Sequence, residues 1–289
     1  MTALANRNCL ITGASRGLGV KIAAAFWEAG ANLMLVARSP ESLETAARGL
    51  GACSGQRVVT VTADLRDPLA PERVIAATRN EFDRLDVLVN NAAVQGPIGS
   101  AWTNDPAEWQ STLQVNLVAP VALCCLCVPW MAGQGRGKII NLSGGGATGP
   151  RANFSAYATA KAGLARFSET LAEETRALGI DVNCVAPGAM DTAMLEAVLQ
   201  AGPAVAGQKE YDAALRVRRQ QGGALPERAV ALCVFLASSA CDDITGKLIS
   251  AVWDPWETCT EHREDLAKTD IYTLRRIVPQ DRGRAWGER

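Results

Sequence analysis

Short apolar runs rich in β-branched residues alternate with longer segments of helical apolar spacing, from the first residues to about Val252. This alternation is typical of repeated βαβ units, which build a parallel sheet. We therefore predict an α/β fold, a doubly wound, seven-stranded, Rossmann-like sheet with helices on both faces. The predicted strands are Asn8–Ile11, Asn32–Ala37, Arg57–Thr62, Val87–Asn90, Lys138–Leu142, Asp181–Ala186 and Lys247–Val252. The predicted crossover helices include Leu18–Ala29, Pro71–Phe82, Ser155–Leu178 and Glu227–Ala237.

The predicted domain organisation is simple, because no repeat, low-complexity tract or linker interrupts the first 250 residues. We expect one dinucleotide-binding and catalytic domain over residues 1–253 and a C-terminal extension over residues 254–289. Between Pro187 and Gly223, glycines and prolines surround two short helical pieces. This segment, about residues 188–223, is either a mobile cover over the site or a surface excursion.

The extension is not plainly disordered, because it contains Trp253, Trp256 and Tyr272. Two interpretations remain open. The extension either packs against another subunit or borders the substrate pocket, or it is a dispensable surface segment.

Composition excludes several classes of partner. The chain of 289 residues has 29 basic and 30 acidic side chains, and this near-neutral balance argues against a nucleic-acid partner. The longest apolar stretch, Leu117–Ala132, is shorter than the ~20 residues that span a bilayer and contains two prolines, so we expect a buried helix and no membrane partner. The start of the chain lacks the apolar segment of a signal peptide, which favours a cytoplasmic protein.

Cysteine and histidine usage favours neither disulfides nor a metal. The nine cysteines are scattered through apolar segments of a large chain, so we expect free thiols. Cys124, Cys125 and Cys127 lie close together, but the single histidine is His262 and no second cysteine pair lies at ligand spacing. We therefore predict no metal site.

The first predicted strand runs into a glycine-rich turn that opens a helix, with glycines spaced as GxxxGxG. Glycine allows the backbone to turn sharply and to approach a pyrophosphate, and the helix N-terminus offers N–H groups to anionic oxygens. Strand, turn and helix in this order predict a dinucleotide site rather than a plain tight turn. The residues assigned to the cofactor are Gly13, Ser15, Arg16, Gly17, Leu18 and Gly19.

The second predicted strand ends in Val36-Ala37-Arg38, without the acidic residue that commonly holds the adenosine ribose hydroxyls. Arg38, with Arg16, would instead bind a 2′-phosphate through charge-assisted hydrogen bonds. This pattern predicts NADP(H) rather than NAD(H) as the cofactor. The alternative is that one or both arginines lie in solvent.

Two further strand ends are candidates for cofactor contacts. Asp64, followed by Leu65, either accepts from the adenine amino group or caps the following turn. The fourth predicted strand ends in Asn90-Asn91-Ala92-Ala93, where small residues leave room for the cofactor and the amides brace neighbouring strands. We assign Asn91 and Ala92 to the cofactor site.

Tyr157 and Lys161 are four residues apart on one predicted helix, so their side chains share a face. Tyrosine has an ordinary pKa of about 10, and a nearby ammonium lowers it by favouring the phenolate. Ser143 ends the fifth predicted strand, before a loop that returns to this helix. Its hydroxyl would hold a substrate oxygen beside the Tyr157 hydroxyl.

In these motifs the sequence resembles the short-chain dehydrogenase/reductase family over roughly residues 5 to 252. The resemblance implies Ser143, Tyr157 and Lys161 as a catalytic triad, joined by Asn116, which links the lysine to a proton relay through a bound water. A PGxxxT motif implies that Pro187, Gly188 and Thr192 lie near the nicotinamide carboxamide.

The resemblance also implies the chemistry. Hydride passes between the nicotinamide and a carbon that bears oxygen, Tyr157 transfers the proton, and Ser143 orients that oxygen. Lys161 holds the nicotinamide ribose and lowers the pKa of the tyrosine. A small-molecule carbonyl or alcohol is the implied substrate, with carbonyl reduction the favoured direction. The helices over Leu117–Met131 and Ser155–Leu178 imply a homodimer or homotetramer, unless they merely cover the sheet of one subunit.

Some alternatives remain open. A catalytically silent regulatory or scaffold protein would keep the fold without turnover, but it would not need an acid–base tyrosine. The substrate is not identified by the sequence. The last predicted strand, Lys247–Val252, ends in Ile249-Ser250-Ala251-Val252 rather than in the V-D-G-G type sequence of the family, which weakens the case for an acyl carrier protein substrate. Met190, Met194, Leu195, Trp253 and Trp256 would form an apolar pocket, whereas Arg216, Arg218 and Arg219 would attract an anionic group.

Overall fold

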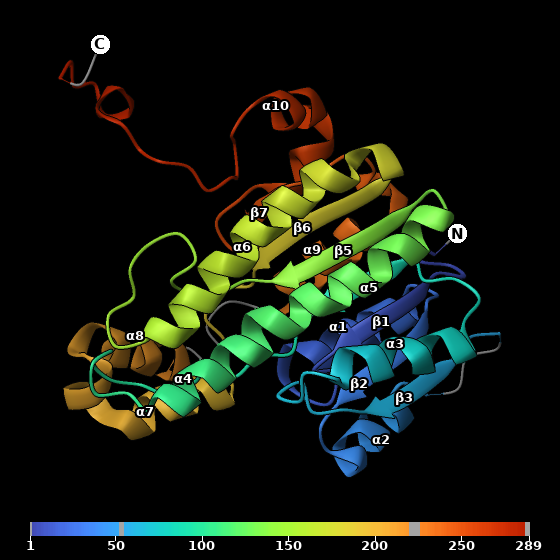
Figure 1. The fold of residues 1–289 in the computed structure, drawn as a ribbon, viewed down its shortest axis with the longest axis horizontal. Helices are drawn as coiled ribbons and strands as arrows, with labels where there is room; N and C mark the ends of the chain where they lie inside the picture. The colour runs from blue at the N-terminus through green and yellow to red at the C-terminus, as the bar shows by residue number, and fades with distance from the viewer. Residues whose placement is uncertain (1, 52–54, 220–225, 287–289) are drawn as a thin grey trace.

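The computed structural model describes residues 2–51, 55–219 and 226–286. Its core is one parallel sheet of seven strands in the order β3-β2-β1-β4-β5-β6-β7, which confirms the predicted fold class (Figure 1). Every predicted strand forms, with ends within two residues of those expected. The strands are β1 (Asn8–Thr12), β2 (Asn32–Ala37), β3 (Val58–Thr62), β4 (Val87–Asn90), β5 (Gly137–Leu142), β6 (Ile180–Ala186) and β7 (Leu248–Ser250).

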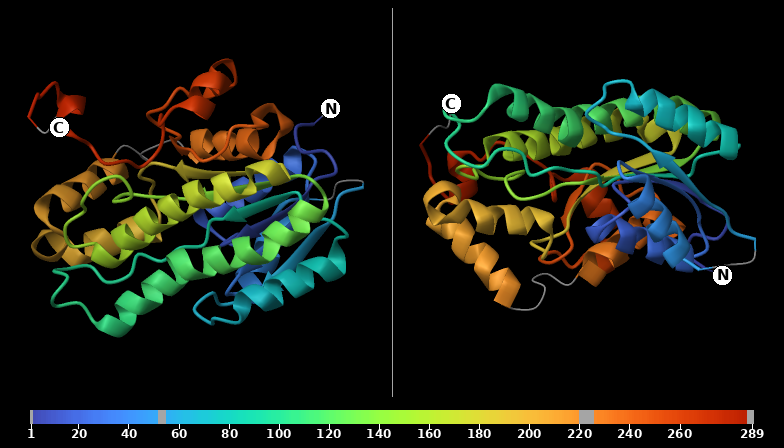
Figure 2. Two further views of the ribbon diagram at one scale, coloured as in Figure 1. Left: turned by 45° about the horizontal axis from the view of Figure 1, so that its top comes forward. Right: turned by 90° about the horizontal axis from the view of Figure 1, so that it is seen from below.

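Helices cover both faces of the sheet, because its central strands β1, β4 and β5 are buried on both sides. One face carries α1 (Gly17–Glu28), α2 (Pro40–Gly49) and α9 (Pro226–Ala237), which pack into one apolar cluster. The other face carries α3 (Ala70–Glu81), α5 (Ala119–Gly133) and α6 (Ser155–Thr175), which form a second cluster (Figure 2).

The strand order reverses between β1 and β4, which are direct neighbours with Cys9 opposite Val87. The crossover connections of β1 and β4 leave in opposite directions, and a crevice opens beyond the carboxyl ends of these strands. Chemistry in a doubly wound sheet is therefore expected at this edge.

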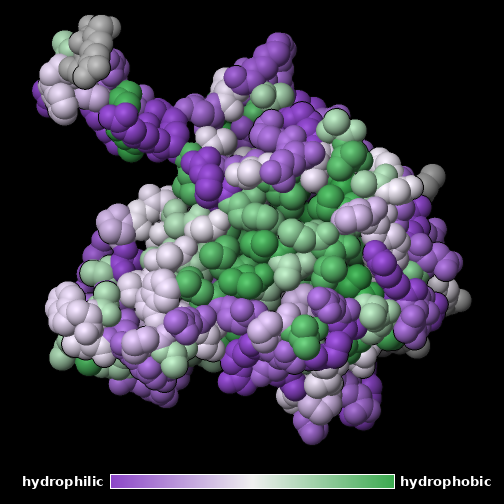
Figure 3. Space-filling model, viewed as in Figure 1, coloured by the Kyte–Doolittle hydropathy of each residue, from purple (hydrophilic) through white to green (hydrophobic). Residues whose placement is uncertain are grey.

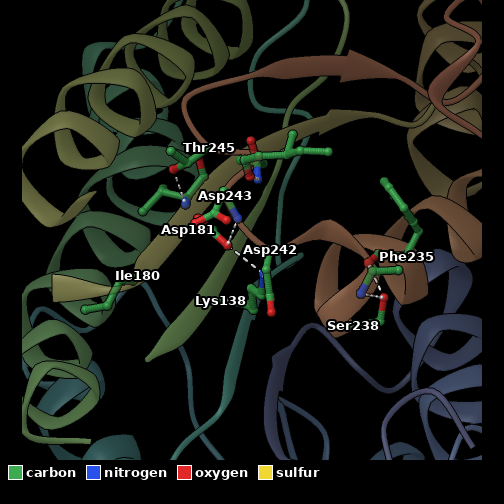
Figure 4. A network of polar contacts seen from close by, with 12 residues as sticks. Lys138, Ile180, Asp181, Phe235, Ser238, Asp242, Asp243 and Thr245 are labelled. Atoms are coloured by element: carbon green, nitrogen blue, oxygen red, sulfur yellow. Dashed lines mark hydrogen bonds and ion pairs between the residues drawn. The ribbon is translucent and has the colours of Figure 1, made fainter. Parts of the chain in front are cut away.

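The opposite edge is closed by a partly buried ion-pair network. The Nζ of Lys138 on β5 lies 2.6 Å from a carboxylate oxygen of Asp181 on β6 and 2.6 Å from one of Asp242. Figure 4 shows Lys138 between these two carboxylates. Lys138 is paired with Asp181 in the strand register, so the network holds the amino ends of β5 and β6 to the turn before β7.

The long apolar stretch lies in a continuous helical run, Pro106–Gly133. We expected a buried helix here, but this one is only partly buried. The run joins α4 (Pro106–Leu113), a π-helical turn η1 (Gln114–Val118) and α5. Among the described residues it alone is long and apolar enough to span a membrane, yet it packs on the sheet with 44% of its most apolar part buried. Its outer side, with that of α6, forms an apolar surface area (Figure 3).

The segment after β6 folds into two helices longer than the short pieces expected, α7 (Ala193–Ala206) and α8 (Gln208–Arg219). Gly202, with φ of +72°, breaks α7 with a kink before Pro203. We call α7 and α8 the cover. The cover packs Leu195, Val198 and Ala214 against Phe154 in a separate apolar cluster. The Gly222-Gly223 pair of the expected segment lies outside the described residues.

The start of the extension is part of the core. It folds into a 3₁₀ turn η4 (Trp256–His262) and the short helix α10 (Arg263–Lys268). Trp256, Cys259 and Leu266 are buried in the same cluster as α9. The ring of Trp256 lies 5.8 Å from that of Phe235, whereas Trp253 is 84% exposed, so the two tryptophans do not share the expected substrate pocket. The boundary between residues 253 and 254 stays a prediction.

After α10 the chain runs beside the edge strand. The Leu248 N–H donates to the Tyr272 carbonyl at 2.8 Å. The Leu274 N–H donates to Glu169 of α6 at 2.6 Å. The first bond satisfies one backbone group on the free edge of β7, which would otherwise be unpaired, and the second attaches the chain to α6. The chain then projects from the body through a last turn, η5 (Pro279–Arg282) (Figure 1).

We expect Trp256→Ala to lower the free energy of unfolding by about 3 kcal/mol, because a large buried ring is replaced by a cavity. Trp253→Ala is the matched control and should change stability by less than about 0.5 kcal/mol, since its side chain is exposed. Chemical denaturation measures both. Equal effects of the two substitutions would show that the extension is not part of the core.

Candidate active site

The glycine-rich turn between β1 and α1 uses its three glycines differently. A Cβ atom on Gly13, whose φ is +66°, would lie 2.8 Å from the Cα of Ala92, and one on Gly19 would lie 2.1 Å from the Gly13 carbonyl oxygen. These two glycines therefore serve the close packing of the turn. Gly17 has φ of +58° and faces open space. It leaves the N-terminus of α1 accessible to an anionic group, as a dinucleotide pyrophosphate requires.

Asn91 and Ala92 brace this turn, as expected. Their N–H groups both donate to the Thr12 hydroxyl oxygen at 3.1 Å. The Asn91 side-chain amide donates to the carbonyls of Thr12 at 3.0 Å and Gly13 at 3.1 Å. The carboxyl ends of β1 and β4 are thereby fixed to each other.

Arg16 and Arg38 are both exposed at this edge of the sheet, Arg16 directly before α1 and Arg38 directly after β2. Neither guanidinium forms an ion pair or a hydrogen bond with another described residue. Arg38 contributes to the lowered pKa of Asp64, so its charge lies near the end of β3. The binding of a 2′-phosphate by these two guanidinium groups stays a prediction.

Asp64 caps the turn that follows β3. Its carboxylate accepts from the Arg66 N–H at 3.0 Å and from the Arg66 guanidinium at 2.9 Å. The hydrogen bonds from Arg66 hold the pKa of Asp64 below its usual range. The turn-capping interpretation is therefore what the structure shows, while the adenine contact stays a prediction. Leu65 beside it is buried.

The Tyr157 hydroxyl lies at the carboxyl end of β5, beside the residue that follows Ser143. A Cβ atom on Gly144 would lie 2.5 Å from the Tyr157 hydroxyl oxygen, so this hydroxyl lies against the backbone directly after Ser143. The Ser143 hydroxyl is buried without a hydrogen-bond partner among the described residues. A buried polar group without a partner is costly, and the oxygen of a substrate would satisfy it.

Lys161 lies one helical turn after Tyr157 on α6. Its Nζ is 5.7 Å from the centre of the Tyr157 ring and donates to the Leu142 carbonyl at 2.7 Å. Burial lowers the pKa of Lys161 to about 8. Burial also raises the pKa of Tyr157, and the opposing effect comes from Arg151. The expected influence of Lys161 on Tyr157 stays a prediction.

A buried polar chain fixes α6 to the sheet. The side-chain amide of Asn90 on β4 donates to Asn141 on β5 at 2.9 Å, and that of Asn141 donates to Ser168 on α6 at 2.7 Å. The Cys184 thiol on β6 lies 3.2 Å from the Ser168 hydroxyl oxygen. The Asn90 amide oxygen has no partner among the described residues, but the other bonds of this buried network restrict movement. The helix that carries Tyr157 and Lys161 is therefore held in register with β4, β5 and β6.

Asn116 lies in the π-helical turn η1 and is fully buried. Its side chain accepts from the Val94 N–H at 2.8 Å and donates to the Val94 carbonyl at 2.8 Å. These bonds hold the loop after β4. Both ends of the side chain are thus occupied, and the implied link to Lys161 through water stays a prediction.

The PGxxxT residues lie on the chain between β6 and the cover. Pro187 and Gly188, with φ of +84° at Gly188, follow β6 directly, and Thr192 precedes the first turn of α7. The Ser143 N–H donates to the Val185 carbonyl at 2.8 Å, which joins this strand to the one that ends in Ser143. All motif residues therefore belong to one edge of the sheet.

Arg151 and Glu210 form an ion pair near Tyr157 and are not among the site residues predicted from the sequence. Arg151 lies in the loop between Ser143 and Tyr157, and its guanidinium is 5.7 Å from the centre of the Tyr157 ring. The only sequence signal was an arginine within that loop. Its partner on α8 could not be identified, because the two residues are 59 positions apart.

Comparison with known proteins agrees with this geometry. A family model described as short chain dehydrogenase matches residues 7–202. The cis-4-hydroxycyclohexanecarboxylate dehydrogenase of Sinomonas cyclohexanicum is 34% identical over 252 residues, which cover 86% of this chain and 96% of the relative. A 3-oxoacyl-[acyl-carrier-protein] reductase of Chlamydia trachomatis is 30% identical over 250 residues, covering 86% and 96%. The crystal structure of levodione reductase matches with a TM-score of 0.78 and 27% identity, covering 89% of this chain and 99% of that one.

Proposed function

The chain belongs to the short-chain dehydrogenase/reductase family, and on that basis we propose that it interconverts a carbonyl and a secondary alcohol, with NADP(H) as cofactor and Tyr157 as acid and base. As a family member it is an oxidoreductase that uses a nicotinamide dinucleotide and acts on a small molecule. The buried Ser143 hydroxyl supports this proposal most directly, because it has no hydrogen-bond partner among the described residues and the Tyr157 hydroxyl lies against the backbone of the next residue, Gly144.

The residues at the sheet edge fit a dinucleotide, because Gly17 leaves the N-terminus of α1 open, and Arg16 and Arg38 at this edge have no ion-pair partner among the described residues. When bound, the cofactor supplies or accepts the hydride. The residues proposed to hold it are Gly13, Ser15, Arg16, Gly17, Leu18, Gly19, Arg38, Asp64, Leu65, Asn91, Ala92, Tyr157, Lys161, Pro187, Gly188 and Thr192.

The chain's own residues perform the proton transfer. The Ser143 hydroxyl holds the substrate oxygen by a hydrogen bond. During reduction Tyr157 donates its proton to that oxygen, and during oxidation its phenolate accepts the proton back. Lys161, whose ammonium donates a hydrogen bond to the Leu142 carbonyl, supplies positive charge near the Tyr157 ring.

Reduction of a carbonyl panel tests this function. Purified protein is mixed with NADPH or NADH and with ketones, 3-oxoacyl thioesters, quinones and keto-sugars. The panel includes 4-oxocyclohexanecarboxylate, because one relative is named for the corresponding alcohol. We expect an alcohol product with NADPH. Binding of NADPH without turnover of any compound would instead favour a silent cofactor-binding protein.

We also propose a homo-oligomer that forms through the apolar surface of α5 and α6 (Figure 3). Apolar side chains that are exposed or half-buried on these helices support this proposal, since monomers rarely leave such a continuous area uncovered. They are Val118, which precedes α5, then Val121, Ala122, Cys125, Leu126 and Pro129 of α5, and Ala162 and Phe167 of α6.

Cys125→Asp is expected to convert the oligomer to a monomer, because it places a charge in the apolar interface. Light scattering after size-exclusion chromatography measures the mass. Leu69→Asp, at an exposed apolar residue before α3, is the control and should leave the mass unchanged. An unchanged mass for Cys125→Asp would exclude this interface.

A further inference from the structure

Arg151 joins the loop before α6 to the cover. Its side chain is 18% exposed, and its Nε and Nη2 atoms donate to one carboxylate oxygen of Glu210 on α8 at 3.0 and 2.9 Å. The guanidinium lies 3.9 Å from the centre of the Phe154 ring and 5.7 Å from that of Tyr157. One arginine thus contacts both the cover and the surroundings of the proposed acid–base group.

The loop backbone leaves space for this arginine. A Cβ atom on Gly145 would lie 3.7 Å from the Cδ, Nε and Nη1 atoms of Arg151. Gly146 has φ of +93°, and a Cβ atom there would lie 3.3 Å from the Cβ of Arg151 and 2.6 Å from that of Ala158. The Arg151 side chain therefore lies along Gly145 and Gly146, which restrict its conformation on that side.

The cover contacts this region in two ways. Leu195, Val198 and Ala214 of α7 and α8 pack on Phe154, and Glu210 pairs with Arg151. The apolar contact packs the cover on the loop, whereas the ionic contact places the Glu210 carboxylate next to the guanidinium that faces Tyr157. A displacement of α8 from the loop would separate Glu210 from Arg151 and leave the guanidinium charge unopposed.

Few charged groups surround Tyr157 in the described part of the chain. Lys161 faces the Tyr157 ring from α6 itself, and Arg151 faces it from the preceding loop. The Cys184 thiol on β6 is near Lys161. Glu210 on α8 acts through Arg151. Burial raises the pKa of Tyr157, and the charge of Arg151 opposes this rise.

We propose that Arg151 is a positioning residue for proton transfer, whose charge stabilises the Tyr157 phenolate to an extent set by Glu210 of the cover. The proposal rests on the proposed function of Tyr157. With the cover in place, Glu210 offsets the charge of Arg151 and Tyr157 keeps its proton, ready to donate to a carbonyl oxygen. With the cover displaced, the phenolate is favoured. The position of the cover and the ionisation of the acid–base group are thereby coupled.

The test is a titration of the tyrosines, which needs neither cofactor nor substrate. The chain has three tyrosines, so tyrosine labelled with ¹³C at the hydroxyl-bearing carbon gives few NMR signals, and the one absent in Tyr157→Phe belongs to Tyr157. Arg151→Met is expected to raise the titration midpoint of Tyr157 by about one pH unit, because a cation at this separation is removed. Glu210→Gln is expected to lower the midpoint, because the charge of Arg151 is no longer offset.

If the ion pair were only structural, breaking it from either side would shift the titration midpoint of Tyr157 in the same direction. Opposite shifts would therefore show an electrostatic effect. Arg151→Lys keeps the charge and should stay close to the wild-type midpoint. Arg218→Met removes another cation of α8, one paired with Glu196 of α7, and should leave Tyr157 unchanged. Thermal unfolding confirms that each variant is folded over the pH range used.

Shifts in the same direction for Arg151→Met and Glu210→Gln, or no shift in either, would overturn the proposal. Failure of the proposed function has a different signature. In that case carbonyl reduction by the wild-type protein would persist in Tyr157→Phe, whatever the titration shows.

Discussion

Tyr157→Phe is expected to lower the kcat/KM for carbonyl reduction by about a thousandfold, because positioned general acids contribute roughly 10²–10⁴ to the rate. The phenyl ring fills the same buried space but carries no proton to donate. The Ser143 hydroxyl still meets the substrate oxygen, so binding should change little. Steady-state rates with the best substrate of the panel measure the effect.

Tyr272→Phe is the matched control for this substitution. Tyr272 contacts the edge strand through its backbone carbonyl, so loss of its hydroxyl should not change turnover. The dissociation constant of NADPH should be similar in both variants and in the wild-type protein. Retention of most of the activity in Tyr157→Phe would show that another group transfers the proton.

Arg38→Asp is expected to lower the preference for NADPH over NADH by about 100-fold. The substitution removes a charge-assisted hydrogen bond, worth about 1.5–3 kcal/mol, and adds a carboxylate that repels the 2′-phosphate. NADH lacks this phosphate, so its binding should not weaken. The ratio of kcat/KM values for the two cofactors measures the preference.

Arg48→Asp is the control for Arg38→Asp, since it reverses a charge on the exposed side of α2 beyond the end of β2. It should leave the ratio unchanged. An unchanged ratio in Arg38→Asp would mean that Arg38 lies in solvent when the cofactor is bound. That outcome is the alternative that the sequence leaves open, and the chain would then discriminate weakly between the two cofactors.

The sheet and its edge could be predicted because their signals are local. Buried parallel strands are short continuous apolar runs, and the glycine-rich turn and the Tyr157–Lys161 spacing each lie within a few neighbouring residues. The helix Pro40–Gly49 was not among the predicted helices, since its surface is mostly polar and only Leu43 and Ala46 are buried. Its start is marked by Ser39, whose hydroxyl caps the first turn.

The remaining features depend on contacts between distant parts of the chain. Residues 117–132 are apolar all round, so periodicity cannot tell which side of the helix faces the sheet and which stays exposed. Trp253 and Trp256 look alike in sequence, yet only Trp256 reaches the core beneath α9. The pair of Arg151 and Glu210 exists only because the cover folds back over the loop after β5.

The most direct test of the account is isotope transfer from the cofactor to the product. NADPH with deuterium at both C4 positions is incubated with the protein and a carbonyl from the panel, and the alcohol is analysed by mass spectrometry. We expect one deuterium on the carbinol carbon, at a rate that falls about a thousandfold in Tyr157→Phe. An alcohol without deuterium, or an equal rate of transfer in the variant, would contradict it.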